Sequence, residues 1–536
     1  MDPVYPVDPH PDPSWSGWGD PALVPELPEA VRRLLADGFG VRGGPQPPRS
    51  IADLKPPAPQ LDDRAVASLA EIVGREHALT DDETRIRHLR GKSTPDLLRL
   101  RAGDLAGAPD AVLLPSSHEE VLAVLRVCSE WRIAVVPYGG GTSVVGGLEP
   151  QAREGFVALD TRRMNALREL DEESRLAVLE PGLRGPQAEE LLGARGYTIG
   201  HFPQSFEYAT LGGFAAARSS GQASAGYGRF DELVLGLRIA TPAGTLSLGR
   251  APRSAAGPDL RQLILGSEGA FGVVTSLTVQ VRRAPEARIY DGWRFASFAD
   301  GLAAVRRLAQ DGPLPTVLRL SDEAETALNL MRPGALVSGP SGDGCLLIAG
   351  YEGAVREVDS RHARATLALQ HAGGRIEPEA GEDWERDRYR GPYLRDALLD
   401  AGALVETLET VTFWSAVPRL YEAVSSALQQ SLSAQGTPPV VLCHVSHVYP
   451  SGASLYFTVT CAQAEDPVAQ WRAAKVAASD AILAAGGSIT HHHGVGTDHR
   501  DWYVREVGEL GIATLRAVKA TLDPAGIMNP GVLIPT

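Results

Sequence analysis

Lysine, cysteine and long hydrophobic stretches are all scarce in this 536-residue chain, and each shortage excludes something. The lysines are Lys55, Lys92, Lys475 and Lys519, and the formal net charge of −15 argues against nucleic-acid binding, which needs a basic face. No apolar run approaches the ~20 residues that span a bilayer, so membrane contact must be peripheral. The N-terminus has neither a basic region nor an apolar segment of the secretory kind, so we expect a protein that is not secreted.

The cysteines indicate the redox environment. Cys128, Cys345, Cys443 and Cys461 lie far apart and show no metal-ligand spacing. They predict reduced thiols in a cytoplasmic protein. The remaining composition, 43% hydrophobic and 22% charged, is that of a soluble globular protein, and the length allows two or more domains with full cores.

The most informative stretch is a glycine-rich loop at residues 137–147, Pro-Tyr-Gly-Gly-Gly-Thr-Ser-Val-Val-Gly-Gly. It follows an apolar run at 133–136 that predicts a short buried strand. Glycines let a backbone approach a ligand closely, and successive N–H groups in such a turn form an anion-binding concavity. The spacing matches neither the Gly-x-Gly-x-x-Gly nor the Gly-Lys-Ser/Thr phosphate loop. The loop predicts a pyrophosphate site, with a plain glycine-rich surface turn as the alternative.

Further small-residue loops lie between apolar runs downstream. They occupy residues 203–213, 218–228 and 266–275, and Asp-Pro-Ala-Gly-Ile-Met-Asn-Pro-Gly follows at 523–531. In this order they resemble the FAD-binding domain of the vanillyl-alcohol oxidase family of flavoproteins. The resemblance implies an α+β fold, in which a PCMH-type FAD-binding domain is joined to an α+β substrate-binding cap domain.

The same resemblance implies which residues hold FAD. The loop at 137–143 would take the pyrophosphate, and the later loops would line the rest of the cofactor. The predicted cofactor residues are Pro137, Tyr138, Gly139, Gly140, Gly141, Thr142, Ser143, Pro203, Ser205, Thr210, Gly213, Ala216, Arg218, Ser219, Glu268, Gly269, Gly272, Val273 and Val274. Covalent members of the family often place a histidine just after the glycines, where this chain has Thr142, so we expect FAD to be bound non-covalently.

Patterns along the chain predict four parts. Residues 1–105 form an N-terminal arm and helical segment, 106–285 the FAD-binding domain, 286–485 the substrate domain, and 486–536 a segment that returns to the interface. The first 60 residues are rich in proline and glycine, so we expect them to run over the surface, with one helix at 30–35.

Local patterns predict the secondary structure within these parts. Ser117-x-x-Glu120 is a capping box for a helix that continues to about Trp131, and Thr241-Pro-Ala-Gly predicts a hairpin turn. Strands are predicted at 111–114, 133–136, 156–159, 176–179, 235–240, 345–349, 440–444 and 454–460. Further helices are predicted at 298–309, 354–372 and 417–434.

The second strong feature is Thr-His-His-His-Gly-Val-Gly at residues 490–496. In an extended strand His491 and His493 share one face and His492 takes the other, so the run is a poor preformed metal site. A metal would need carboxylates or another histidine from elsewhere, and we expect none. A polar surface turn is a further alternative. We favour a cluster of proton-transfer and anion-binding groups, because imidazole titrates near neutral pH.

Among these flavoproteins, the histidine run resembles that of the alkylglycerone-phosphate synthases (alkyldihydroxyacetonephosphate synthases), which make the ether bond of ether lipids. Segments at 15–19, 319–322, 393–396 and 453–457 resemble the same group, so the likeness extends over nearly the whole chain.

The resemblance assigns roles to individual residues. It gives Tyr456 an acid/base role, Arg395 substrate binding, Arg319 a role in activity, and an essential role to the histidines at 491–493. Arginine suits bidentate phosphate capture, so we expect both arginines and one or more of these histidines to converge near the flavin as a phosphate clamp. The residues alone favour the alternatives, in which Tyr456 is a core or surface aromatic with a satisfied hydroxyl and each arginine is half of a surface ion pair.

The implied activity exchanges the acyl group of an acyl-dihydroxyacetone phosphate for a fatty alcohol, with the ketone fragment held on flavin N5 in between. Two departures reduce the expected charge: substrate-binding His444 and Thr497 stand where this group has arginine and lysine. They favour the alternative, an FAD-dependent oxidoreductase of a 2-hydroxy acid or related alcohol. A protein that keeps FAD for structure alone is the third interpretation.

We expect a lipid-like small-molecule substrate, a homodimer and no nucleic-acid partner.

Overall fold

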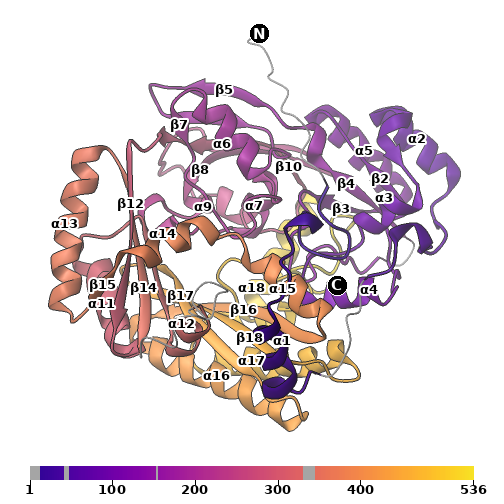
Figure 1. The fold of residues 1–536 in the computed structure, drawn as a ribbon. Helices are drawn as coiled ribbons and strands as arrows, with labels where there is room; N and C mark the ends of the chain where they lie inside the picture. Colours follow the sequence, from indigo (N-terminus) through magenta and orange to yellow (C-terminus); the bar gives the residue numbers. More distant parts are fainter. Residues whose placement is uncertain (1–11, 42–47, 153–154, 330–343) are drawn as a thin grey trace.

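Four β-sheets organise the residues described in this computed structural model, which are 12–41, 48–152, 155–329 and 344–536 (Figure 1). A four-stranded sheet, a five-stranded sheet and a two-stranded ribbon are built from residues before about 284, and a seven-stranded sheet from later ones. In Figure 1 the first group fills the upper part, in indigo to magenta, and the seven-stranded sheet the lower part.

The four-stranded sheet leads into the glycine-rich loop. Its order is β1 (Ala78–Leu79), β2 (Ala111–Leu113), β4 (Phe156–Asp160) and β3 (Ala134–Tyr138). The last three strands are parallel, and every residue of β2 and β4 is buried, as expected where both faces of a parallel sheet are covered. The predicted strands at 111–114, 133–136 and 156–159 are confirmed, and the loop begins where β3 ends.

Helix α5 (His118–Trp131) confirms the predicted capping signal. The Ser117 hydroxyl accepts a hydrogen bond from the N–H of Glu120 at 3.1 Å. The Glu120 carboxylate accepts from the N–H of Ser116 at 2.7 Å rather than from that of Ser117, so the box closes one residue earlier than expected. The buried face of the helix is Val121, Val124, Leu125 and Cys128, which follows the helical period.

The five-stranded sheet is antiparallel and confirms the predicted hairpin. Its order is β5 (Leu167–Asp171), β6 (Leu176–Leu179), β10 (Val273–Gln280), β8 (Val234–Thr241) and β9 (Gly244–Leu248). Thr241 pairs with Gly244 across the turn between β8 and β9. The two-stranded ribbon joins β7 (Tyr197–Thr198) to β11 (Arg282–Arg283).

The seven-stranded sheet is antiparallel throughout. Its order is β15 (Arg375–Glu377), β12 (Ala287–Phe295), β14 (Cys345–Gly353), β13 (Val317–Ser321), β17 (Val440–Val448), β18 (Gly452–Ala462) and β16 (Ala403–Phe413). One face is covered by α11 (Phe298–Asp311), α13 (Val355–His371) and α16 (Val417–Ala434), on which α17 (Pro467–Ala484) packs. The first three helices and the strands at 345–349, 440–444 and 454–460 confirm the predictions.

Side-chain alternation in three adjacent strands of this sheet separates its core from a polar wall. Each strand places two hydrophobic residues in the core beneath the helices. These pairs are Leu318 and Leu320, Cys443 and Val445, and Leu455 and Phe457. The residue between each pair must point to the opposite face, and these residues are Arg319, His444 and Tyr456. Three residues remote in sequence are therefore neighbours because of strand register, with His444 directly opposite Tyr456.

The N-terminal arm differs from the expectation that the first 60 residues run over the surface. The arm from Ser16 to Gly19 is buried, and Trp18 is only 5% exposed. The backbone N–H of Trp18 donates to the carboxylate of Asp396 at 2.6 Å, and the Lys92 ammonium donates to the carbonyl of Ser14 at 2.5 Å. Proline and glycine content does not distinguish a loose linker from an extended strap packed on the protein. The predicted helix at 30–35 is confirmed in α1 (Glu29–Arg33), which continues as a π-helix, Leu34–Gly38.

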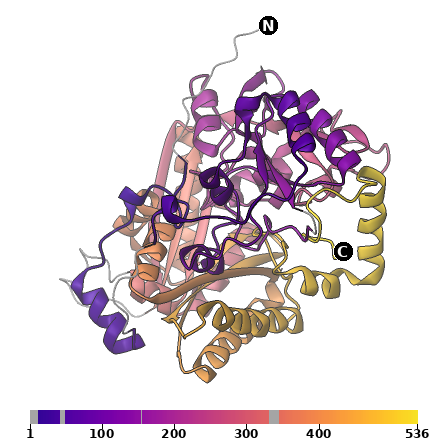
Figure 2. The same ribbon diagram turned by 90° about the vertical axis from the view of Figure 1, so that its right-hand side faces the viewer.

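The C-terminal segment returns to the glycine-rich loop. After helix α18 (Arg500–Leu522), the N–H of Val135 in β3 donates to the carbonyl of Ile527 at 2.9 Å. The Asn529 amide donates to the carbonyls of Gly147 at 3.0 Å and Glu268 at 2.7 Å, so it joins two of the predicted cofactor loops. Figure 2 shows α18, in yellow, running along one side of the molecule before the chain turns back inward.

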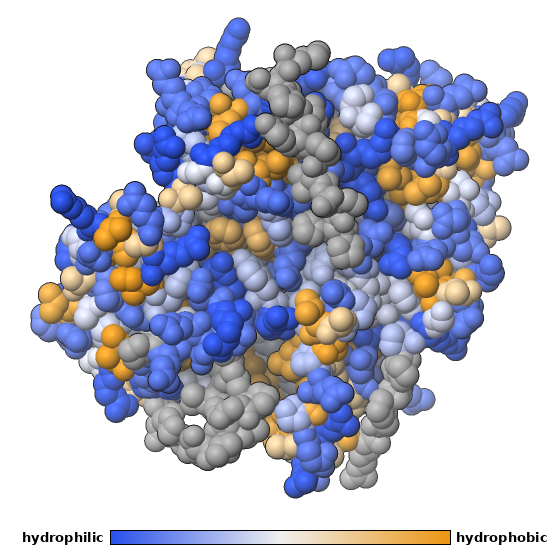
Figure 3. Space-filling view, turned by 45° about the horizontal axis from the view of Figure 1, so that its top comes forward, coloured by the Kyte–Doolittle hydropathy of each residue, from blue (hydrophilic) through white to orange (hydrophobic). Residues whose placement is uncertain are grey.

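The remaining helices are short. They are α2 (Asp63–Val73), α3 (Asp82–Arg87), α4 (Thr94–Arg101), α6 (Gly185–Gly193), α7 (Leu211–Ala217), α8 (Ser224–Tyr227), α9 (Phe230–Leu233), α10 (Arg261–Ile264), α12 (Glu323–Asn329), α14 (Pro378–Asp387) and α15 (Gly391–Asp400). Among the described residues, no helix has the length and apolar character that crossing a membrane requires. On the face drawn in Figure 3, hydrophobic residues form small, separate patches in a mostly hydrophilic surface.

Candidate active site

A cavity of about 1020 Å³ is lined by residues of both groups of sheets and of the N-terminal arm. Every predicted cofactor residue except Arg218 lines it. Ligand cavities for small molecules are commonly about 300–1,000 Å³, so this one has room for a molecule as large as FAD. The Arg218 guanidinium instead donates to the carbonyls of Leu265 and Gln262, each at 2.9 Å, and ties α7 to α10.

The glycine-rich loop fits the pyrophosphate role, for a reason that differs in part from the expected one. Within the described residues, the N–H groups of Gly140, Gly141 and Thr142 donate to no protein acceptor, which leaves them for an anion. A Cβ on Gly140 would collide with the carbonyl oxygen of Tyr208. That glycine is required by the neighbouring loop at 203–210, and Gly141 by its positive φ of +66°.

Glu268 links the cofactor loops to the histidine segment. Its carboxylate accepts hydrogen bonds from the backbone N–H groups of Val495 and Gly496, both at 3.0 Å. Burial raises the pKa of Glu268 to about 7, against the lowering effect of these two donors. The side chain therefore holds the histidine segment against the cofactor site.

The polar wall of the seven-stranded sheet faces this cavity. Arg319, His444 and Tyr456 all line it. The rings of His444 and Tyr456 are stacked with their centroids 4.9 Å apart, and His493 lies 5.6 Å from Tyr456 on the same measure. Burial raises the pKa of Tyr456 to about 12, so this residue is a protonated phenol at neutral pH.

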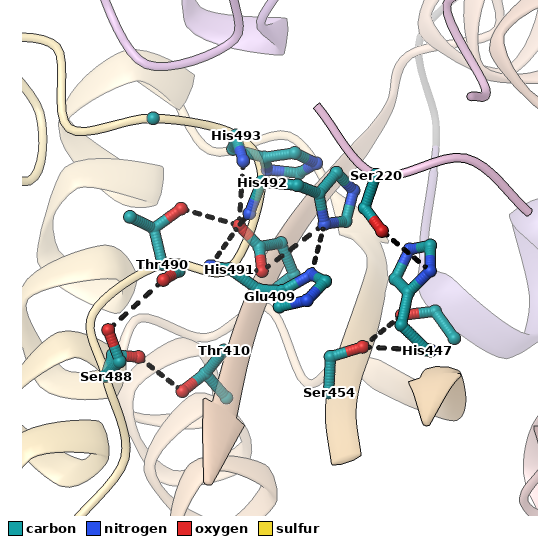
Figure 4. A network of polar contacts seen from close by, with 12 residues as sticks. Ser220, Glu409, Thr410, His447, Ser454, Ser488, Thr490, His491, His492 and His493 are labelled. Carbon is teal, nitrogen blue, oxygen red and sulfur yellow. Dashed lines mark hydrogen bonds and ion pairs between the residues drawn. The ribbon is translucent and has the colours of Figure 1, made fainter. Parts of the chain in front are cut away.

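The three consecutive histidines form a bend around a buried carboxylate and not an extended strand (Figure 4). One oxygen of Glu409, in β16, accepts from the backbone N–H groups of His491 at 2.9 Å, His492 at 3.0 Å and His493 at 2.9 Å. The expected strand-like alternation is wrong because this carboxylate draws three successive N–H groups to one point. His492 and His493 line the cavity, whereas His491 lies behind them and bonds the Tyr449 hydroxyl at 2.6 Å.

The negative charge in the histidine bend lies on the carboxylate of Glu409. Burial raises the pKa of this carboxyl, but the adjoining histidines and the Thr490 hydroxyl outweigh it and hold the pKa well below its usual range. Burial lowers the pKa of His491, of His492 and of His493, the last to about 3. The site thus combines an ionised carboxylate with imidazoles that stay neutral at neutral pH.

The two arginines of the predicted clamp line the same cavity, but each already has a carboxylate partner. Arg319 donates to Glu325 at 2.5 Å, and the second oxygen of Glu325 lies 3.0 Å from Nδ1 of His444. Burial raises the pKa of Glu325, but His444 and Arg319 outweigh it and hold that pKa at about 2. Arg395 in α15 bonds Asp396 at 3.1 Å and the carbonyl of Lys92 at 2.6 Å.

Sequence reasoning missed the partners of these residues. Glu409 and a second acid, Glu406, both lie in β16 among leucine, valine and threonine residues, and acids in such a run are a signal that could have drawn attention to them. Glu325 and Asp396 carry no such signal, because both lie in polar helical segments. His447 lies in β17 beside the histidine bend and was also missed, although it is three residues from His444.

Comparison with known proteins agrees with this geometry. A family model described as "FAD binding domain" matches residues 109–248, and one described as "FAD linked oxidases, C-terminal domain" matches residues 284–533. The alkyldihydroxyacetonephosphate synthase of Dictyostelium discoideum is 36% identical over 480 residues, covering 85% of this chain and 79% of that protein. The enzyme of that name from Trypanosoma brucei brucei is 31% identical, covering 97% and 92%.

A solved structure titled as an alkyldihydroxyacetonephosphate synthase superposes with a TM-score of 0.83 at 29% identity, covering 97% of this chain and 98% of that one. The predicted α+β fold with a PCMH-type FAD-binding domain is confirmed, and so is FAD as the cofactor. The chain belongs to the alkyldihydroxyacetonephosphate synthase family of FAD-dependent enzymes.

Proposed function

We propose that this enzyme exchanges the acyl group of an acyl-dihydroxyacetone phosphate for a fatty alcohol and so forms an ether bond. One observation carries the proposal: a single cavity joins the FAD loops, a wall of arginines and acid/base groups, and an apolar end. Bound FAD supplies the covalent chemistry of the exchange, and the side chains of the cavity bind the substrates and move protons.

The apolar end of the cavity suits an alkyl chain. It is formed by the α1 segment and, facing it, by α15 and two strands of the seven-stranded sheet. The residues are Leu27, Val31, Leu34, Leu35 and Phe39, with Leu398, Val405 and Leu442 opposite. Each methylene buried here contributes about 0.8 kcal/mol, so a long-chain alcohol gains affinity that a small hydroxy acid cannot.

The polar wall suits a phosphorylated ketone. Arg319 and Arg395 keep N–H donors in addition to those that bond their carboxylates, and a guanidinium binds phosphate through such paired donors. Tyr456, protonated at neutral pH, donates a hydrogen bond to a substrate oxygen. His492 and His493 line the cavity beside Tyr456, with ring centroids 6.4 Å and 5.6 Å from its ring, and complete the polar wall around the substrate.

The test is a product assay with the purified FAD-loaded enzyme. We expect an acyl-dihydroxyacetone phosphate and a fatty alcohol to yield an alkyl-dihydroxyacetone phosphate and one free fatty acid per ether formed. A second sample receives a 2-hydroxy acid without oxygen. The proposal would be contradicted if the flavin bleached with the 2-hydroxy acid and no ether formed in the sample with the fatty alcohol. That result would support the alternative, an FAD-dependent oxidoreductase.

Three expectations accompany the proposed activity. The division of the chain into four parts, the homodimer and peripheral membrane contact all stay predictions. The homodimer is checked by the mass of the enzyme in solution, and membrane contact by flotation with lipid vesicles.

A further inference from the structure

Three histidines from two separate segments meet at the wall of the cavity. His447 comes from β17, and His491 and His492 come from the histidine bend (Figure 4). One ring nitrogen of each lies within 4.8 Å of those of the other two. His447 and His492 line the cavity. The sequence suggested that the histidine run would need a further histidine from elsewhere to bind a metal, and His447 is in that position.

The spacing of the rings matches three imidazoles on one metal ion. Their centroids are 4.9 Å apart for His447 and His491, 5.1 Å for His447 and His492, and 5.2 Å for His491 and His492. Imidazoles bound to one tetrahedral zinc ion at about 2.0–2.1 Å place their ring centres roughly 5 Å apart. Nδ1 of His491 and Nδ1 of His492 are 3.0 Å apart, close to the separation of about 3.3 Å that two ligands of such an ion have.

In His447 and His491, a second ring nitrogen has a partner that orients the ring. Nδ1 of His447 bonds the hydroxyls of Ser220 at 3.1 Å and Ser224 at 2.8 Å, which leaves Nε2 for a metal. Nε2 of His491 bonds the Tyr449 hydroxyl at 2.6 Å, so Nδ1 is the nitrogen that faces Nδ1 of His492. Partners of this kind fix the tautomer and orientation of metal-binding histidines.

The electrostatic setting also favours a cation. The ionised carboxylate of Glu409 lies 3.7 Å from Nδ1 of His492 and offsets positive charge. Arg229 is the nearby cation, and its guanidinium is paired with Asp231 at 3.0 Å.

We propose that His447, His491 and His492 bind one divalent transition-metal ion of the zinc class. The three protein ligands leave a fourth position open toward the cavity, as in catalytic zinc sites. There the ion would polarise a carbonyl or phosphoryl oxygen of the bound substrate. This goes beyond the proposed exchange reaction and replaces the expectation of a metal-free site.

The experiment measures bound metal and needs no substrate, so its outcome is independent of the proposed activity. The FAD-loaded enzyme is dialysed against a chelator, reloaded with zinc, and analysed for zinc and flavin per chain. We expect one zinc per chain in the wild type and more than about a 100-fold loss of affinity in His447→Gln, because even loss of an orienting partner costs about 10- to 100-fold. Ser224→Ala should lose about 10- to 100-fold.

The matched control is His118→Gln. His118 is also buried and bonds the hydroxyls of Thr275 and Thr245, each at 2.7 Å, but it lies outside the cluster. It should keep the zinc stoichiometry of the wild type. Flavin content reports whether a variant is correctly folded. If His447→Gln does not retain flavin, the measurement is made on His492→Gln instead. Zinc binding by the wild type that is no tighter than in these ligand variants would overturn the proposal and leave a hydrogen-bonded imidazole cluster.

Discussion

Replacement of Tyr456 by phenylalanine removes one hydroxyl from the polar wall and changes little else. The ring stacks on His444 with centroids 4.9 Å apart, and phenylalanine can keep that contact. The residue lies in the middle of β18, between Leu455 and Phe457, which are both fully buried. We therefore expect the variant to fold, to bind FAD and to bind substrate.

The expected loss is in the chemical step. Burial holds the pKa of Tyr456 at about 12, so the hydroxyl acts as a proton donor throughout the neutral range. A positioned acid or base is typically worth about 10²–10⁴ in rate, which is about 3–5 kcal/mol of barrier. We expect kcat to fall by this factor in Tyr456→Phe, with KM little changed. Because the wild-type phenol stays protonated, its ionisation should cause no loss of rate below about pH 10.

The assay is steady-state ether formation by flavin-loaded enzyme, with Tyr421→Phe as the matched control. The Tyr421 hydroxyl bonds Asp322 at 3.1 Å, and its ring packs against the core beneath the sheet, away from the polar wall. That variant should keep turnover within about threefold, since it loses a hydrogen bond worth about 1 kcal/mol of stability. Turnover by Tyr456→Phe near that of the control would make Tyr456 a packing residue and refute the reasoning.

Four further predictions concern the arginines and the cofactor. Arg395→Ala should weaken binding of a phosphorylated ketone about 10- to 150-fold, because charge-assisted hydrogen bonds to the phosphate are lost. Binding of an uncharged alcohol should change far less. Equal effects on the two ligands in a binding titration would argue against a phosphate-binding role for Arg395. The pKa of Glu325 is depressed to about 2, so its ion pair stabilises the fold above about pH 4.3 and is lost as the pH falls. The difference in Tm between the wild type and Glu325→Gln should therefore shrink between these pH values, and a constant difference would contradict the pairing. Gly140→Val should abolish FAD binding because its side chain collides with the carbonyl of Tyr208, and full flavin occupancy in the purified variant would be inconsistent with this. FAD should be non-covalent, since Thr142 follows the glycines, so acid precipitation should leave the yellow colour in the supernatant and not in the pellet.

Features set by short-range sequence could be predicted. The capping residue Ser117 gave the start of α5, and the apolar periods of residues 298–309 and 417–434 gave two helices that cover the large sheet. The strand predicted at 454–460 lies within β18, so the extended backbone around Tyr456 was also predicted. The loop at 137–147 could be identified from its run of glycines, and the later cofactor loops through their resemblance to the family.

Features set by long-range contacts could not be predicted. The bend of the three histidines depends on Glu409, about eighty residues away in the sequence. Trp18 packs on Tyr208 and Tyr393, and its backbone N–H bonds Asp396, residues that are all remote from it in the sequence. In both cases a buried carboxylate collects backbone donors from a remote segment, and only the tertiary structure shows which segment it meets.

The absorbance of the flavin during turnover without oxygen tests the central claim most directly. The enzyme is mixed anaerobically with an acyl-dihydroxyacetone phosphate and a fatty alcohol, and flavin absorbance and ether formation are followed together. Acyl exchange involves no net transfer of electrons, so many ethers per flavin should form while the flavin ends fully oxidised. Bleaching that persists after one turnover, with no ether formed beyond it, would contradict the account and make the enzyme an oxidoreductase.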